Sequence, residues 1–284
     1  MSETKKAPRI ILNVIIIIFM LVWIIPTAGL LITSFRPAAD VSSSGWWTVF
    51  NSPLKFTQYT IENYKDVLTT GGMAIAFRNS FIIAIFGTLF PVLVAAFAAF
   101  GLSRIQFKGR SLAYGLIVSL LVVPLQLTFI PVLKLYNLMG LSGSFAGLWL
   151  AHTGYGLPFA VFMLHNFFYS LPDDLFEAAY IDGASLWTVF YRLALPLSVP
   201  ALASLVIFQF LWVWNDLLVA LIYLGGFRSV APLTMRLSSL VGSYGQSWHL
   251  LTSAAFISMF VPIIIFFSLQ RYFVRGILAG SVKG

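Results

Sequence analysis

The chain has 284 residues, of which 60% are hydrophobic and only 9% are charged, and its net charge is +8. A globular domain of this length cannot bury so many apolar side chains, so most of the chain must lie in lipid. This composition excludes a cytosolic enzyme, a nucleic-acid-binding domain and a secreted module, and the lack of cysteine excludes disulfide, iron–sulfur and thiolate chemistry.

Six apolar stretches are each long enough to cross the hydrocarbon layer as a helix, which needs about 20 residues. They cover residues 10–34, 77–103, 112–135, 145–168, 199–224 and 251–272. The stretches are continuous rather than alternating, as expected of helices and not of barrel strands. The first is far longer than a signal-peptide core of about 7–15 residues, so we expect it to remain as an anchor. The sequence therefore predicts an all-α polytopic membrane protein with a single transmembrane domain over residues 1–284.

The distribution of basic residues orients these spans. If the N-terminus is cytoplasmic, ten of the 17 Lys and Arg residues fall on the cytoplasmic side, and the excess is clearest in the short loops. Both termini are therefore predicted to be cytoplasmic. Two longer connections follow from this arrangement, an external loop over residues 35–76 and a cytoplasmic loop over residues 169–198.

The cytoplasmic loop is predicted to form two short amphipathic helices. Pro172 and the two aspartates after it favour a helix start, because negative charge stabilises the positive end of the helix dipole. Gly183 is expected to end this helix, since glycine tolerates left-handed backbone. A second helix should then run from Ser185 to Leu195 and end at Pro196. Such a pair of helices either docks on a partner protein or lies on the lipid headgroups.

Small and acidic residues recur in this loop at a specific spacing. Glu177-Ala178-Ala179 is followed by Asp182-Gly183-Ala184 and then by Leu195-Pro196. This pattern resembles the EAA loop of ABC importer permeases, and the wider loop resembles the carbohydrate-uptake branch of the maltose-transporter type. The resemblance extends over nearly the whole chain, including the six spans, the string Trp214-Asn215-Asp216 in the fifth span, and the tail over residues 279–284.

The resemblance implies that the loop over residues 171–197 couples this chain to a separate ATPase subunit. Glu177 would meet a basic residue of that subunit, while small residues beside it would let the helix sit deep in a cleft. Gly183 would form the turn between the two coupling helices. The coupling residues implied by the family pattern are Glu177, Ala178, Ala179, Asp182, Gly183, Leu195 and Pro196.

The resemblance also implies a set of partners. They are a second permease with a six-span core, two ABC ATPase subunits that use ATP and Mg, and an extracytoplasmic sugar-binding protein. The chain itself would bind no cofactor and no nucleic acid. It would lie in a bacterial or archaeal cytoplasmic membrane, crossing the bilayer several times.

What the sequence lacks supports a permease rather than an enzyme. It contains no Gly-Lys pair, so it has no Walker loop for ATP, and its three histidines form no metal-binding set with a carboxylate. No catalytic constellation can be assembled within one span. A carrier driven by protons or sodium normally has ionisable relay residues inside its spans, and here one acidic residue, Asp216, lies clearly within a span.

Two stripes of polar and aromatic residues are candidates for the substrate pathway, because sugars need hydrogen-bonding groups and flat apolar faces. On a helical wheel the stripe in the fifth span lies within about 60°. It consists of Gln209, Trp212, Asp216 and Tyr223, with Asn215 at its border. In the fourth span Tyr155, Phe159, Phe162 and Asn166 share a face. Each of these residues could instead pack or anchor helices.

The third span contains two prolines, Pro124 and Pro131, which are expected to bend it. The bend is either a hinge or a static kink. Taken together, the sequence predicts a permease subunit of an ATP-driven importer that forms half of the pathway for an oligosaccharide or glycoside. The alternatives are an ABC permease for another small solute and an ion-coupled carrier.

Overall fold

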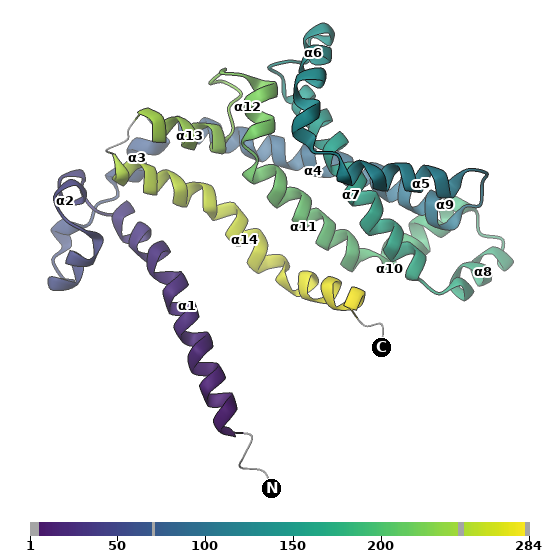
Figure 1. Ribbon diagram of the computed structural model, residues 1–284, viewed down its shortest axis with the longest axis horizontal. Helices are drawn as coiled ribbons and strands as arrows, with labels where there is room; N and C mark the ends of the chain where they lie inside the picture. The colour runs from purple at the N-terminus through teal and green to yellow at the C-terminus, as the bar shows by residue number, and fades with distance from the viewer. Residues whose placement is uncertain (1–5, 70–71, 244–246, 282–284) are drawn as a thin grey trace. The chain divides into compact units, whose positions relative to one another are not determined.

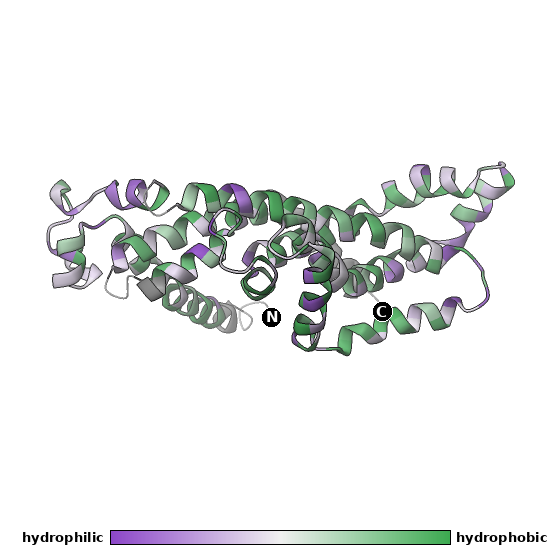
Figure 2. Cartoon of the chain, turned by 90° about the horizontal axis from the view of Figure 1, so that it is seen from above, coloured by the Kyte–Doolittle hydropathy of each residue, from purple (hydrophilic) through white to green (hydrophobic). Residues whose placement is uncertain are grey.

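The computed structural model describes residues 6–69, 72–243 and 247–281, and all regular secondary structure in these ranges is helical (Figure 1). Four helices there are long and apolar enough to cross a membrane: α1 (Lys6–Ser34), α4 (Met73–Arg104), α7 (Phe145–Ser170) and α14 (Trp248–Ser281). Hydrophobic residues cover most of their described length (Figure 2). Residues 282–284, which end the tail used for the resemblance, lie outside the described residues.

The third predicted span is a bent pair of helices. It consists of α5 (Arg110–Ser119), the short turns η3 (Leu120–Val122) and η4 (Leu125–Thr128), and α6 (Phe129–Met139). The two halves meet at 95°. Pro124 explains the position of the bend, because a proline has no N–H to donate and forces the residue before it, here Val123, into extended backbone. The bend predicted from the prolines is confirmed.

The fifth predicted span is broken, and the prediction of one continuous helix over residues 199–224 is wrong. Helix α11 (Val199–Asn215) ends, and α12 (Leu218–Leu224) begins after two residues. The Asp216 carboxylate accepts the N–H groups of Val219, at 3.3 Å, and Ala220, at 3.0 Å. An aspartate in this place stabilises a new helix start, so the chain restarts instead of continuing.

The chain divides into two compact units, of which the first combines residues 1–74 with 236–259. It contains α2 (Ala38–Ser43), the turns η1 (Trp46–Asn51) and η2 (Phe56–Gln58), α3 (Glu62–Leu68) and most of α13 (Leu233–Ser243). The buried Asn63 amide donates to the carbonyls of Ser34, at 2.9 Å, and Arg36, at 2.8 Å. These bonds hold α3 against the end of α1.

The second unit combines residues 75–235 with 260–284 and has a core of its own. Small residues on α4, such as Ala95 and Ala99, share this buried core with large residues of α7, such as Leu164 and Phe168. Between α7 and α11 the chain forms α8 (Asp173–Ile181), α9 (Leu186–Val189), the π-helical η5 (Phe190–Ala194) and α10 (Leu195–Leu197). Phe176 of α8 and Phe190 of η5 are buried in the same core.

Asn79 near the start of α4 provides a test of this second unit. Its buried amide donates to the carbonyls of Ser229, at 2.8 Å, and Ala231, at 3.1 Å. Asn79→Ala is expected to lower the free energy of unfolding by about 1–3 kcal/mol, because the carbonyls lose their donor. Thermal unfolding in detergent measures this. Asn137→Ala, at an exposed position of α6, is the control, and an equal loss in both variants would contradict the assignment.

Candidate functional site

The connection between α7 and α11 has the predicted two helices joined by a glycine. Helix α8 begins directly after Pro172 with two aspartates in its first turn. Gly183 has a φ of +78°, the left-handed backbone expected where a glycine ends a helix. The Ser185 hydroxyl then accepts the N–H of Thr188 at 3.2 Å and caps the start of α9.

The second helix of this connection differs from the regular helix predicted to end at Pro196. It begins as α9, widens into the π-helical η5, and continues through α10 to Leu197 before a turn at Ser198. Pro196 cannot donate a backbone hydrogen bond to the carbonyl of Arg192, four residues earlier, and the widened turn lies there. The segment over 186–197 meets α11 at 74°.

The residues of the family pattern divide into an exposed set and a packed set. Glu177, Ala178, Asp182, Gly183 and Pro196 are exposed, whereas Ala179 and Leu195 are partly buried against the core. Large apolar side chains lie exposed in the same connection: Ile181 (85%), Trp187 (64%) and Tyr191 (53%). Exposed aromatic and apolar side chains in the same short connection as an exposed carboxylate are typical of a protein-binding surface. We call these exposed residues of α8, α9 and η5 the docking surface.

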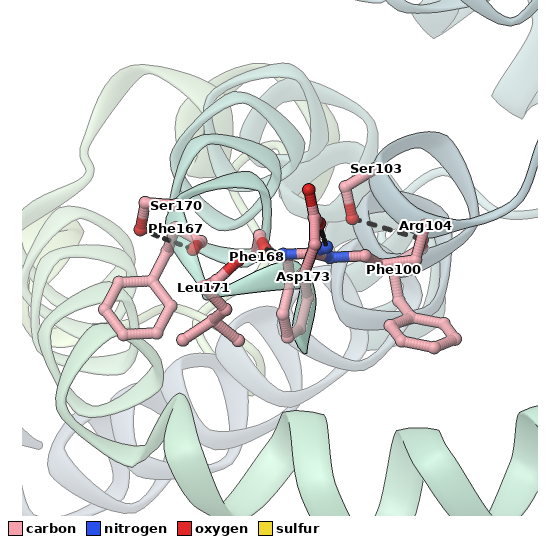
Figure 3. Close-up of polar contacts among 8 residues, drawn as sticks. All are labelled: Phe100, Ser103, Arg104, Phe167, Phe168, Ser170, Leu171 and Asp173. Atoms are coloured by element: carbon pink, nitrogen blue, oxygen red, sulfur yellow. Dashed lines mark hydrogen bonds and ion pairs between the residues drawn. The ribbon is translucent and has the colours of Figure 1, made fainter. Parts of the chain in front are cut away.

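Arg104, the last residue of α4, joins this connection to two long helices (Figure 3). Its guanidinium donates to the carbonyl of Phe168, at 3.1 Å from Nε and 2.5 Å from Nη2, and to that of Leu171, at 2.6 Å. It forms an ion pair with Asp173 and lies 3.9 Å from the centre of the Phe176 ring. This role of Arg104 cannot be recognised from the sequence, because an arginine at the end of an apolar span is ordinary lipid-flanking charge.

A cavity of about 260 Å³ lies between α7 and α11. It is lined by Tyr155, Gly156 and Phe159 of α7 and by Phe208, Gln209 and Trp212 of α11. Four of the residues in the two predicted stripes therefore come together: Tyr155, Phe159, Gln209 and Trp212. The lining provides four aromatic rings and one amide, a combination that offers flat faces and hydrogen-bonding groups to an uncharged ligand.

Two glycines that the sequence did not mark as important determine the position of Gln209: one accepts its hydrogen bond and the other leaves room for it. Its amide nitrogen donates to the carbonyl of Gly87 on α4 at 3.2 Å. A Cβ on Gly156 would lie 2.5 Å from the same nitrogen, so α7 can carry only a glycine beside it without displacing the side chain. Gln209 thus lines the cavity and also connects α11 to α4.

Tyr155 takes part in a chain of hydroxyl groups. Its hydroxyl is 2.8 Å from that of Thr128 and 2.6 Å from that of Tyr223. The chain joins η4 of the bent third span, α7 and α12. Tyr223 is fully buried and is not among the cavity-lining residues, although the helical wheel had placed it on the same stripe as Gln209. The break at Asp216 explains the difference, because the two residues belong to separate helices.

The other predicted pathway residues lie elsewhere. Asp216 caps α12, and its carboxylate is 3.9 Å from the ring of the buried His152, whose nitrogens have no hydrogen-bond partner among the described residues. Asn215 is exposed and donates to the carbonyl of Leu211 in its own helix at 2.7 Å. Asn166 is exposed and accepts a bond from the Tyr114 hydroxyl at 3.3 Å. In the described ranges no three His, Asp or Glu residues gather as metal ligands.

Comparison with known proteins identifies the family. Residues 91–279 match the family described as the binding-protein-dependent transport system inner membrane component. The chain is 56% identical over 281 residues to the osmoprotective compounds uptake permease protein GgtD of Synechocystis sp., covering 99% of this chain and 94% of that protein. It is 36% identical to the alpha-glucoside transport system permease protein AglG of Rhizobium meliloti, with full coverage of both chains.

The fold also matches a solved structure, a bacterial ABC transporter involved in the import of the acidic polysaccharide alginate. The TM-score is 0.78 at 19% identity, over 96% of this chain and 99% of that one. The chain therefore belongs to the permeases of binding-protein-dependent ABC importers, the family predicted from the EAA-like loop. It is a multi-pass inner-membrane subunit of a family that is not catalytic and binds no cofactor itself.

Gly156 tests the packing around the cavity. Gly156→Ala is expected to lower the free energy of unfolding by about 1–3 kcal/mol, since the added methyl displaces the Gln209 amide from its bond to Gly87. Thermal unfolding of the purified chain measures the loss. Gly154→Ala is the matched control, because a Cβ there meets no atom within 4 Å. Equal stability of the two variants would show that the close approach of Gln209 is absent.

Proposed function

We propose that this chain forms half of the pathway of an ATP-driven importer for a small, uncharged, polyhydroxylated solute, a glycoside or oligosaccharide. In this proposal the docking surface binds a separate ATPase subunit, and a cavity between α7 and α11 contacts the solute. The observation that carries the proposal is the docking surface itself, where Glu177 and large apolar and aromatic side chains are exposed in the same connection.

The proposal includes an orientation. Both termini and the docking surface face the cytoplasm, as favoured by the ten basic residues on that side. ATP hydrolysis by the partner then moves α8 and the helices attached to it, so that the pathway opens alternately to the two sides. A second six-span permease, two ATPase subunits and an extracytoplasmic binding protein complete the transporter.

The nature of the solute rests on two supports. One is the function of two relatives, which are permeases for osmoprotective compounds and for alpha-glucosides. The other is the lining of the cavity, in which Gln209 is the amide among aromatic rings and none of the six lining residues is charged. A non-sugar osmoprotectant is the remaining alternative within the family. An ion-coupled carrier is no longer supported, because the chain belongs to the ABC importers.

Glu177 tests the docking surface. Glu177→Lys is expected to abolish most assembly with the ATPase subunit, because it replaces the acceptor of a charged hydrogen bond with a like charge. Co-purification of the complex and ATP-dependent uptake in proteoliposomes measure the effect. Glu62→Lys is the matched control, since Glu62 is an exposed glutamate on α3 with the same charge change. Normal assembly and uptake by Glu177→Lys would refute the proposed docking.

Two phenylalanines on α7 test the cavity. Phe159 lines it, whereas Phe162, one turn further along and similarly exposed, does not (41% and 38%). Phe159→Ala is expected to lower the maximal uptake of an α-glucoside by up to about tenfold, or 1.4 kcal/mol, through loss of a ring face. Phe162→Ala should leave uptake unchanged. Equal loss of uptake in the two variants would show that the cavity is not part of the pathway. If the transporter takes up quaternary-ammonium osmoprotectants but no glycoside, the alternative solute is favoured.

A further inference from the structure

We propose that Arg104 is a positioning residue that fixes helix α8 onto the ends of α4 and α7, so that a movement of α8 is carried into both helices. The inference rests on the proposed function, because it assumes that the ATPase subunit moves α8. Arg104 lies behind the docking surface, with its side chain only 8% exposed. It is therefore a link between elements and not a contact for the partner.

The end of α7 creates the need for this link. The last carbonyl groups of a helix have no partner within the helix, and many helices satisfy them with a glycine that turns the chain back. Here the chain leaves α7 through Leu171 and Pro172 in extended backbone. The Phe168 carbonyl accepts the N–H of Leu171 at 3.3 Å, and the fork of Arg104 adds donors to this carbonyl and to that of Leu171.

The same guanidinium holds α8 through two further contacts. Its Cζ atom lies over the Phe176 ring, 3.9 Å from the ring centre, and Phe176 is buried in the core with Phe100 and Phe168. Its Nη1 atom pairs with Asp173 in the first turn of α8, although Asp173 is 80% exposed, so this ion pair contributes little by itself. The carbonyl bonds and the stacked ring therefore provide most of the attachment.

The arrangement is suited to transmit force over a short distance. Glu177 faces outward one residue after Phe176, which faces the guanidinium. A push on the outer face of α8 thus reaches Arg104 through a single helical turn. A lysine could keep the charge but not the fork and the stacked plane, so it cannot hold three elements at once.

The first experiment uses the assembled transporter in proteoliposomes and measures uptake per ATP hydrolysed. Arg104→Gln is expected to lower this ratio about tenfold, the factor that corresponds to the loss of one charged hydrogen bond. Arg104→Lys should give an intermediate value. Lys108→Gln, an exposed residue of the same region with the same charge change, should leave it unchanged. A residue with a merely structural role would reduce the yield of complex but not the ratio. An unchanged ratio in Arg104→Gln would overturn the proposal.

The second experiment does not depend on the ATPase subunit. The chain has no cysteine, so paired spin labels can be placed at Tyr169→Cys on α7 and Ile181→Cys on α8, both highly exposed. With Arg104 in place the distance distribution between the labels should be narrow, and Arg104→Gln should broaden it while Lys108→Gln does not. An equally narrow distribution would overturn the proposal. If Arg104→Gln broadens it while Glu177→Lys assembles and transports normally, the proposed docking fails and the fixing of α8 stands.

Discussion

Lipid offers no hydrogen bonds, so every helix that ends or breaks inside the bilayer must satisfy its own backbone groups. This constraint explains the most informative parts of the structure. The break in the fifth span is stabilised by the Asp216 carboxylate, which accepts two N–H groups of α12. The Thr234 hydroxyl donates to the carbonyl of Asp216 at 2.6 Å. Asp216 and Thr234 are therefore the polar residues that satisfy backbone groups where the fifth span is interrupted.

The fold follows from the sequence as far as continuous apolar runs determine it. Four spans agree with their predicted ranges to within a few residues at most ends, because length and hydrophobicity decide them. The bend of the third span was also predicted from its prolines, since a proline removes a backbone donor, although Pro26, Pro91, Pro158 and Pro262 lie inside continuous helices. The break at Asp216 was not, because one aspartate within an apolar run can anchor a neighbouring helix as easily as cap a new one. The structure distinguishes these two roles, because the N–H groups of Val219 and Ala220 donate to the Asp216 carboxylate.

The candidate site was predictable where it depends on local pattern and not where it depends on tertiary contacts. The Gly183 turn and the exposed Glu177 follow from spacing along one short segment. Gln209 and Trp212 were found because they share one face of a single helix. Gly156 and Arg104 were missed, because the importance of each is set by a residue on another helix, Gln209 for the first and Phe168 for the second. A sequence without its contacts contains no signal for either.

The second unit links three long helices at two separate levels. Near the docking surface Arg104 joins α4 to the end of α7, and beside the cavity Gln209 joins α11 to the carbonyl of Gly87 on α4. The docking surface itself is the connection between α7 and α11, the two helices that line the cavity. A force on this connection therefore acts directly on the cavity walls, and no long chain of intermediate contacts is needed. Helix α4 is thus tied to α7 at one level and to α11 at the other. Through these two links the three helices are suited to move together, so that a small movement at one end changes the access at the other.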